Sequence, residues 1–353
     1  MRIFIFQPYL THYRTAIFNK LNKYFYIKLA FNSSNKESHI KANLNKDIKI
    51  IYTKKKKFFG VVYQKNLIKK IQIRNINSII LASDIKSLTQ LKLILYSKIS
   101  DYKIFLWGHG LFKKKINIFN FIFYKFYFYL ISFFITKYIC YNKICFDSLI
   151  GFLPKKKMVI LNNTLEKKID PSSIKKNYKI SKDLLFVGRL RDKCGLMLLL
   201  KALSELKNSY IKLHVIGDGK NLVNYKNYSK KLNVNVTFYK KRIFFSKIAS
   251  KCFAGVYPGD TGLSVVDYMM HGLPVIIHNK INDHMGPEAA YIINRYNGLN
   301  FKKNSSNDLK SKIMKLYKNR TLVAKLGNNS IKTIKKLNKE SMHISLKKII
   351  ERS

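Results

Sequence analysis

The sequence predicts an α/β protein built from two doubly wound, Rossmann-like domains that face each other across a cleft. Short apolar runs alternate with segments of helical spacing, and this alternation occurs twice along the 353 residues. Strands of a parallel sheet that are buried on both faces have this uninterrupted apolar pattern. A chain of this length also exceeds what one hydrophobic core usually organises, so two domains are expected.

The expected strands follow from the positions of these runs. In the first half they are Ile3–Gln7, Ile27–Phe31, Ile48–Tyr52, Ile79–Leu81, Ile104–Trp107, Tyr138–Tyr141 and Met158–Leu161; in the second half they are Leu184–Val187, Leu213–Ile216, Val236–Phe238, Gly255–Tyr257 and Val275–Ile277. The segment Gly195–Lys207 has apolar residues at helical spacing and is predicted to be a crossover helix.

A polar stretch separates the two halves. Residues Thr164 to Asp183 contain a Pro-Ser-Ser turn signal and lack a sustained apolar face. We therefore predict an N-terminal domain at 1–165, a linker at 166–182, a C-terminal domain at 183–335 and a C-terminal helix at 336–353. In such sheets ligands bind at the carboxyl ends of the strands, so the site is expected in the cleft.

The chain is strongly basic. Lys and Arg number 68 and Asp and Glu 18, so the net charge is 68 − 18 = +50. This charge favours an anionic partner, which leaves nucleic acid, a membrane surface and phosphorylated substrates open. Compositional bias is an alternative, because Lys is spread along the chain and accompanied by many Ile, Asn, Phe and Tyr. No nucleic-acid-binding module is recognisable, so no nucleic-acid partner is expected. Because of the high charge, a basic nucleic-acid-binding protein nevertheless remains an alternative function.

Cysteine spacing predicts no metal site. Cys140, Cys145, Cys194 and Cys252 form no zinc-binding pattern with each other or with histidines, and no acidic pair suggests Mg²⁺. Four scattered cysteines are typical of reduced thiols in a cytoplasmic protein. The first ten residues have too short an apolar run for a signal peptide and are expected to form a strand.

The segment Ile116–Ile135 has the length of a membrane span, but Lys125 and polar residues interrupt it. It is rich in Phe and Tyr and follows Lys113–Lys115, which favours a helix lying in the interface of an anionic membrane. A buried core helix and a true span are the alternatives. The interfacial interpretation predicts peripheral binding to a membrane.

Three glycine-containing turns follow strands in the second half. Arg189 comes directly after one strand, with Arg191 and Lys193 close behind and a helix beginning near Gly195. Cationic side chains beside free backbone N–H groups are suited to a diphosphate. Gly217 opens a Gly-Asp-Gly turn after the next strand.

The third turn, Gly259–Gly262, leads into a helix expected to begin near Leu263, whose free N–H groups would face a bound phosphate. Asp267 falls in the second turn of that helix, where its carboxylate can accept two ribose hydroxyls. The alternative is a surface carboxylate on an amphipathic helix.

The order of these motifs resembles the family 4 (group 1) glycosyltransferases, two-domain GT-B enzymes that use nucleotide sugars. Gly-Arg-Leu, Gly-Asp-Gly, the Pro-Gly-x-x-Gly-Leu turn, "HGLPVI" and "GPEAAYIINRYNGLNF" follow one another from Leu184 to Phe301. The first half resembles the family less, through "QPYLTHYRTAIFNKL", "LWGHG" and "MVILNNTL". The Pro-Gly-x-x-Gly-Leu form looks like a subgroup that assembles surface polysaccharides.

The resemblance assigns roles to individual donor-side residues. Arg189 and Lys193 stand for the family's Arg/Lys pair on the donor diphosphate, although the usual lysine falls at Cys194 and Arg191 is a rival. The family's two glutamates, eight residues apart, map to Gly259 and Asp267, so one carboxylate is missing. Gly262, Leu263 and Gly217 line the donor, and Glu288 is the carboxylate expected near it, unless it is an ordinary glutamate at a helix start.

Two residues of the first half are assigned to the reacting sugar and the acceptor. His109, in "WGHG", is the candidate for the reaction centre, and capping a strand end is its alternative role. Arg14 is expected to meet an acceptor phosphate, and a helix-surface arginine is the alternative.

The activity that the resemblance implies is sugar transfer with retention, without cofactor or metal. The donor is a nucleotide sugar, and the acceptor a saccharide or lipid-linked saccharide at the inner face of the plasma membrane, in surface polysaccharide or lipooligosaccharide assembly. The missing carboxylate at Gly259 leaves a GT-B protein that binds a sugar nucleotide without catalysis as an alternative.

Overall fold

The computed structural model describes residues 1–32, 44–71, 73–113, 116–166, 182–206, 210–240 and 245–353. These form two compact units. Unit 1 comprises Met1–Glu166 together with Glu340–Ser353, and unit 2 comprises Lys167–Lys339. The C-terminal helix predicted at 336–353 is therefore divided between the two units, because its last part belongs to unit 1. Most of the predicted linker lies outside the described residues.

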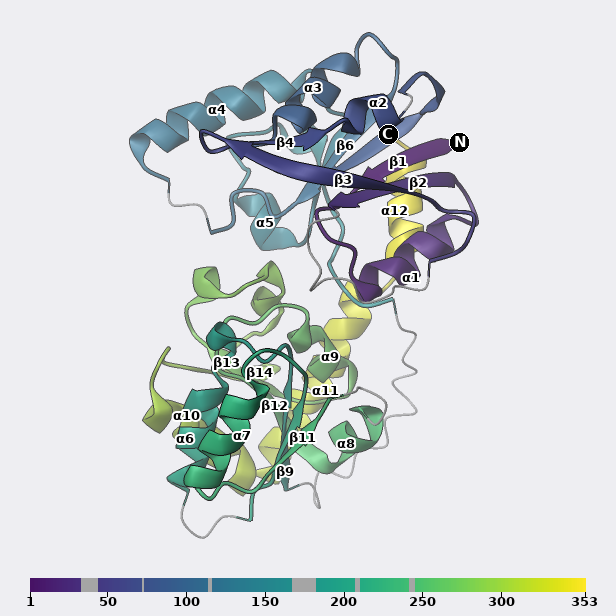
Figure 1. Cartoon of the computed structure of the whole chain (residues 1–353). Coiled ribbons are helices and arrows are strands. Elements are labelled where there is room, and N and C mark those ends of the chain that lie inside the picture. The colour runs from purple at the N-terminus through teal and green to yellow at the C-terminus, as the bar shows by residue number, and fades with distance from the viewer. Residues whose placement is uncertain (33–43, 72, 114–115, 167–181, 207–209, 241–244) are drawn as a thin grey trace. The chain divides into compact units, whose positions relative to one another are not determined.

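Unit 1 is an eight-stranded sheet with the order β4-β3-β2-β1-β5-β6-β7-β8 (Figure 1). The strands are β1 Arg2–Phe6, β2 Tyr26–Asn32, β3 Lys49–Phe58, β4 Val61–Lys65, β5 Ser78–Ala82, β6 Lys103–Gly108, β7 Lys137–Cys140 and β8 Met158–Ile160. The helices are α1 His12–Leu21, α2 Leu67–Ile71, α3 Leu88–Tyr96, α4 Ile118–Ser132, α5 Lys143–Asp147 and α12 Met342–Glu351.

All seven strands predicted in the first half are present, and their neighbours pair in parallel. The eighth, β4, was not predicted and pairs antiparallel with β3. Its residues alternate between buried and exposed, so it lacks the continuous apolar run of a strand that is covered on both faces.

Unit 2 is a six-stranded parallel sheet with the order β11-β10-β9-β12-β13-β14. The strands are β9 Asp183–Val187, β10 Leu213–Ile216, β11 Val236–Tyr239, β12 Cys252–Tyr257, β13 Val275–His278 and β14 Gly298–Phe301. The helices are α6 Leu196–Ser204, α7 Leu222–Lys231, α8 Phe245–Lys251, α9 Ser264–Met270, α10 Ser306–Lys318 and α11 Arg320–Leu337. The five predicted strands are present, β14 is additional, and α6 occupies the predicted crossover helix.

Strand order reverses around β9 in unit 2, because the chain goes from β9 outward to β10 and β11 and then returns to β12 on the other side. The loops after β9 and β12 therefore leave the sheet on opposite sides of one crevice, which is where open parallel sheets bind ligands. The strands beneath are fully buried, with Leu184, Leu185 and Phe186 of β9 at 0% exposure. A rigid core thus supports the loops above it.

Helix α4 contains most of the aromatic segment and has two different faces. Tyr127, Phe128 and Ile131 are buried against unit 1. The opposite face exposes Phe119, Ile122, Phe126 and Tyr129, each by 60–79%. The alternative of a buried core helix therefore holds for one face of α4 and is wrong for the other. Among the described residues, no helix is both long and apolar enough to cross a bilayer.

Candidate functional site

The loops after β9 and β10 lie against each other in unit 2. The Leu190 N–H donates to the Asp218 carbonyl at 2.9 Å, and a Cβ placed on Gly217 would lie 1.9 Å from the Gly188 carbonyl oxygen. Only glycine permits this approach at position 217, because a real Cβ atom stays more than about 3 Å from neighbouring heavy atoms. Gly217 therefore closes one side of the site by backbone packing.

The loop after β12 is joined to the segment that leads into α6. The N–H of Gly259 donates to the Cys194 carbonyl at 3.2 Å, and that of Asp260 donates to the Lys193 carbonyl at 2.9 Å. A Cβ on Gly259 would lie 2.2 Å from the Lys193 carbonyl oxygen. Position 259 therefore has no room for a side chain, which accounts for the carboxylate missing from the expected pair.

The cations near these loops differ in their availability. Arg191 is half-buried, and its Nη2 donates to the Asp260 carbonyl at 2.9 Å. The Arg189 and Lys193 side chains are exposed, and within the described ranges neither has a hydrogen-bond or ion-pair partner. Cys194 is buried, with its Sγ 3.3 Å from the Tyr225 hydroxyl. Arg189 and Lys193 are therefore the cations available to an anion.

Helix α9 begins at Ser264, one residue after the predicted start, with Leu263 as its N-cap residue. Asp267 lies in its first turn, not the second, and only 4% of its surface is exposed. The alternative of a surface carboxylate on an amphipathic helix is therefore wrong. His271 donates from Nδ1 to the Asp267 carbonyl at 2.9 Å, which fixes the end of the same short helix.

Glu288 lies beside the Gly262 turn. It is in the first turn of the 3₁₀ helix Pro287–Tyr291 and is 3% exposed. Its Oε2 would lie 3.7 Å from a Cβ on Gly262 and 2.0 Å from one on Gly286. The Gly286 N–H donates to the Thr261 carbonyl at 3.0 Å. Two glycines thus make room for a buried carboxylate at this turn.

A stacked pair of histidines, which the sequence did not predict, supports the same turn. The rings of His278 and His284 lie 3.7 Å apart and nearly parallel. The Thr261 N–H donates to Nδ1 of His284 at 3.3 Å, and His284 donates from Nε2 to the His278 carbonyl at 3.0 Å. Burial, followed by the charge of His284, lowers the pKa of His278 to about 3, so its ring is neutral at pH 7.

In unit 1, His109 follows β6 and contacts the Tyr141 ring at 4.5 Å. Desolvation, then the positive charges of Arg14 and Lys113, lower the pKa of His109 to about 4. Although part of its side chain remains exposed, the imidazole is neutral at pH 7. It can therefore accept or donate one hydrogen bond without carrying charge.

Arg14 is buried in unit 1. It is 4% exposed, its guanidinium carbon lies 4.0 Å from the Trp107 ring centroid, and its Nη2 donates to Oδ1 of Asn163 at 2.9 Å. The helix-surface alternative is therefore wrong. Arg14 also lies 5.2 Å from the Tyr141 ring, so it and His109 contact the same aromatic side chain.

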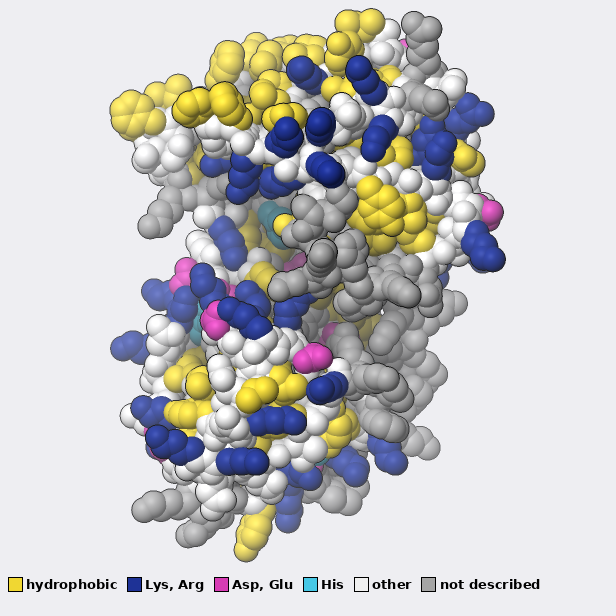
Figure 2. All heavy atoms as spheres, in the orientation of Figure 1, with side chains coloured by type: hydrophobic (Ala, Val, Ile, Leu, Met, Phe, Trp, Pro, Cys, Tyr) yellow, Lys and Arg dark blue, Asp and Glu magenta, His cyan; other side chains and the backbone are white. Residues whose placement is uncertain are grey.

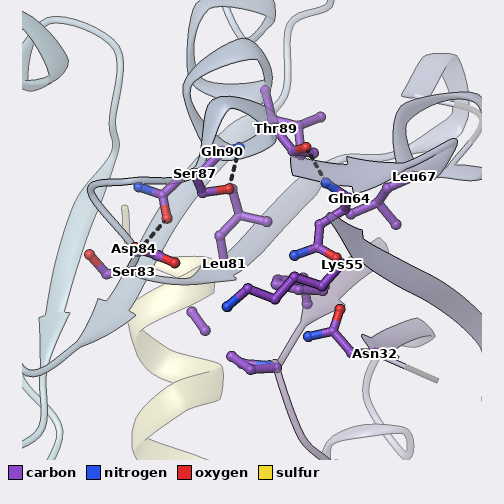
Figure 3. A pocket seen from close by; sticks show the side chains of 14 residues that line it. Asn32, Lys55, Gln64, Leu67, Leu81, Ser83, Asp84, Ser87, Thr89 and Gln90 are labelled. Carbon is purple, nitrogen blue, oxygen red and sulfur yellow. Dashed lines mark hydrogen bonds between the residues drawn. The ribbon is translucent and has the colours of Figure 1, made fainter. Parts of the chain in front are cut away.

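A pocket of about 170 Å³, lined by both polar and apolar side chains, opens in unit 1 at the carboxyl ends of β1, β2 and β5 (Figure 3). Figure 3 shows Asn32, Lys55 and Gln64 on one side and Ser83 and Asp84 on the other. Its members come from five separate segments without a shared motif, so no sequence pattern indicated it. Among the described residues, no cluster of three or more His, Cys, Asp or Glu could hold a metal ion.

The hydroxyl of Thr53 lies 3.1 Å from both Oδ1 of Asn32 and Oε1 of Gln64. A hydroxyl carries one hydrogen, so Thr53 donates to one of these two amide oxygens at a time. Both amide side chains line the pocket, and an amide group contains both a hydrogen-bond donor and an acceptor.

Known proteins resemble this chain both in sequence and in fold. Residues 168–333 match the family model of the glycosyl transferases group 1. A segment of 173 residues is 31% identical to an uncharacterized glycosyltransferase of Methanocaldococcus jannaschii and covers 47% of each chain. The match thus spans about half the length of that relative.

Three solved structures share the fold over at least 98% of both chains. They are Anabaena HepE in complex with UDP (TM-score 0.73, 13% identity), a glycosyltransferase from Rickettsia africae (0.70, 17%) and the lipopolysaccharide outer core galactosyltransferase WaaB (0.66, 13%). The chain has the GT-B fold of these proteins, and the similarity to the group 1 glycosyl transferases covers its residues 168–333.

Proposed function

We propose that the protein is a glycosyltransferase that takes a nucleoside-diphosphate sugar as donor. The observation that carries this proposal is the convergence of the loops after β9, β10, β12 and β13, with Arg189 and Lys193 unpaired beside them. The similarity to HepE, solved with UDP and with UDP-glucose, supports the choice of ligand.

The donor-side residues then have separate tasks. Arg189 and Lys193 bind the diphosphate, together with backbone N–H groups at Gly262 and Leu263. Asp267 accepts the ribose hydroxyls, and Glu288 and the Gly217 turn contact the donor. When the sugar leaves, negative charge develops on the diphosphate, and fixed cations stabilise it. Retention of the anomeric configuration is part of the proposal.

On the acceptor side we assign the pocket of unit 1 to a saccharide. Sugar hydroxyls both donate and accept, and the Asn32 and Gln64 amides, Lys55 and Asp84 offer both kinds of partner. His109, neutral at pH 7, is assigned to the reacting sugar, where a charged imidazolium would repel the cationic character of the transition state. Arg14 acts on the acceptor side by holding Trp107 and Tyr141 in place.

Arg189→Ala is expected to weaken UDP binding by about 1.5–3 kcal/mol, roughly 10- to 150-fold, because an ionic hydrogen-bond donor is removed. Isothermal titration with UDP and other nucleoside diphosphates measures this. Lys226→Ala, an exposed lysine of α7, is the matched control and should bind as the wild type does. Equal affinity in a folded Arg189→Ala variant would remove the diphosphate assignment.

Turnover separates this function from its alternative. Radiolabelled nucleotide sugars, offered with and without lipid extracts as acceptor, should yield free nucleoside diphosphate that depends on the acceptor. If the protein binds UDP but forms no nucleoside diphosphate from any nucleotide sugar under these conditions, it binds sugar nucleotides without catalysis.

We further propose that the protein binds the inner face of the plasma membrane peripherally through α4 and serves surface polysaccharide or lipooligosaccharide assembly with a lipid-linked acceptor. The stripe Phe119, Ile122, Phe126 and Tyr129 recurs at helical spacing and is exposed along its whole length. Such an aromatic stripe fits the boundary between headgroups and acyl chains. Of the lysines that precede it in the sequence, Lys114 and Lys115 lie outside the described residues.

Phe119→Ser combined with Phe126→Ser is expected to reduce cosedimentation with phosphatidylglycerol vesicles about tenfold or more, because two exposed aromatic rings lose their apolar contact. Neither side chain belongs to the buried face of α4, so the melting temperature should stay within about 2 °C. Unchanged cosedimentation would contradict the assignment of α4.

A further inference from the structure

The hairpin formed by β3 and β4 presents an exposed face that the glycosyltransferase site does not use. It is at the edge of the unit 1 sheet, because β4 is the last strand in the strand order and its ladder is with β3. Phe58 and Phe59 form its tip and are 69% and 90% exposed. Their rings contact each other edge to face, 4.6 Å apart. Two phenylalanines thus stand in solvent at the end of a two-stranded ribbon.

The outer face of the hairpin combines aromatic and basic side chains. Residues paired across an antiparallel ladder point to the same side, and Lys56 pairs with Tyr63 while Lys54 pairs with Lys65. Tyr52 and Tyr63 on this face are 51% and 37% exposed. The lysines of the outer face, Lys54, Lys56 and Lys65, are exposed, and across the described ranges none of them forms an ion pair.

The hairpin contains no compensating acid. From Ile48 to Ser83 the sequence has no Asp or Glu. Lys54 and Lys65 lie directly opposite each other, a like-charge pairing that weakens a ladder. The repulsion between these lysines would be relieved by an anionic partner, so binding such a partner is favoured.

The turn also places an aromatic residue where the backbone disfavours one. Phe59 and Gly60 have φ of 43° and 76°, the left-handed conformation of a two-residue hairpin turn. Asn and Asp are preferred before Gly in such turns, and a bulky residue at positive φ is unusual. Phe59 gains no burial in exchange, since it is the most exposed large hydrophobic side chain in the described chain. Contact with a partner would bury this ring.

We propose that the tip and outer face of the β3–β4 hairpin bind an anionic lipid bilayer, with Phe58 and Phe59 inserted among the headgroups and Lys54, Lys56 and Lys65 against lipid phosphates. Aromatic rings prefer this interfacial layer, and basic residues are attracted to its negative surface. A protruding tip of two rings suits insertion into a fluid layer, whereas stacking with nucleic-acid bases would require a basic groove along which the strand runs.

The hairpin adds a second contact to the membrane association proposed for α4, and the inference rests on that association. Figure 2 shows hydrophobic side chains gathered along the edge of unit 1 that α4 occupies in Figure 1, with Lys or Arg side chains next to them. Both elements belong to unit 1, so one unit supplies both contacts.

Phe59→Asn tests the hairpin without harming the fold. Asn suits the left-handed position, so the melting temperature should be equal or higher. Binding to phosphatidylglycerol vesicles, measured by cosedimentation of the full chain, should fall about tenfold, as expected for removing one inserted aromatic ring. Tyr210→Ala, which removes a ring that is 82% exposed in unit 2, is the control and should bind as the wild type does.

The lysines are tested by Lys54→Gln, Lys56→Gln and Lys65→Gln together, against the same change at Lys226, Lys230 and Lys231 of α7, which alters the net charge equally. Only the hairpin triple should lose binding to anionic vesicles, and added salt should reduce the difference. The inference is overturned if both triples bind alike, if Phe59→Asn binds vesicles as the wild type does, or if the hairpin triple loses binding to single-stranded DNA instead.

Failures of the two proposals are distinguishable. If the α4 variant loses vesicle binding while the hairpin variants keep it, the hairpin inference is wrong and the membrane proposal stands. Titration with UDP is independent of both, since Arg189 and the donor loops belong to unit 2.

Discussion

Gly259→Glu is expected to abolish UDP binding, although it introduces the residue that the family resemblance places at this position. The obstacle is the Cβ atom itself, which would lie 2.2 Å from the Lys193 carbonyl oxygen, 2.5 Å from the Cys194 carbonyl carbon and 2.7 Å from the Gly195 nitrogen. All three are backbone atoms and cannot rotate away. The loop could move only by breaking the hydrogen bonds that Gly259 and Asp260 donate to Cys194 and Lys193.

Separating that segment would displace Lys193 from the loop that carries Asp260, and the diphosphate site would lose its shape. We expect a loss of at least about 3 kcal/mol in UDP affinity, more than about 100-fold, since backbone strain and broken hydrogen bonds act together. Gly259→Ala should have nearly the same effect, because the first carbon already causes the overlap.

Isothermal titration with UDP measures both variants. The control is Gly151→Ala in unit 1, where nothing lies within 4 Å of the added carbon. Because Gly151 has a φ of 83°, the substitution strains the backbone, but only within unit 1, and UDP affinity should not change. If Gly259→Glu binds UDP as tightly as the wild type, the two segments separate readily and the backbone account of the missing carboxylate is wrong.

The sequence predicted the two sheets well, because their central strands are buried on both faces and have continuous apolar runs. The strands that escaped prediction lie at sheet edges. In β4 the buried Val62 and Gln64 alternate with the exposed Tyr63 and Lys65, and β14 is four residues long and contains Asn300. Edge strands are covered less completely by neighbouring strands and helices, so fewer of their residues need to be apolar.

The loops of the candidate site followed from strand ends and glycines, but the environment of each side chain did not. The sequence could not reveal that Asp267 is buried, because burial depends on how the seven-residue α9 packs. The contact between Gly259 and the Lys193 carbonyl joins residues 66 positions apart (259 − 193), which no local pattern encodes. The His278–His284 stack likewise has no spacing that distinguishes it from two unrelated histidines.

Arg14 is the other residue whose environment changes its interpretation. Because Arg14 lies in the loop and helix that follow the first strand, the sequence suggested that it contacts an acceptor phosphate. Instead its guanidinium stacks on Trp107, donates to Asn163 and reaches Sδ of Met342 at 3.9 Å, a residue of the C-terminal helix α12. The side chain therefore joins α1, β6, the segment after β8 and the C-terminus within unit 1.

Arg14→Ala is expected to destabilise unit 1 by about 3 kcal/mol, the sum of a lost desolvated cation–π contact, a lost hydrogen bond from a charged group and a cavity beside Trp107. Arg14→Lys keeps the charge but has no planar group to stack on the indole, so an intermediate loss is expected. Urea unfolding followed by Trp107, the only tryptophan of the chain, reports on this unit directly. Lys23→Ala, an exposed cation just after α1, should change stability by less than about 0.5 kcal/mol.

A second readout shows whether Arg14 also tunes His109. The positive charge of Arg14 is one cause of the lowered pKa of His109, after desolvation. Removing that charge should therefore move the pKa of His109 upward, which an NMR titration of the imidazole protons measures, and Arg14→Lys should move it less. If Arg14→Ala leaves both the unfolding free energy and the His109 titration unchanged but raises the KM for an acceptor, Arg14 contacts the acceptor phosphate and the structural role is wrong. The expected pattern is the reverse, because a guanidinium that is enclosed by aromatic rings and bonded to Asn163 acts on its neighbours first.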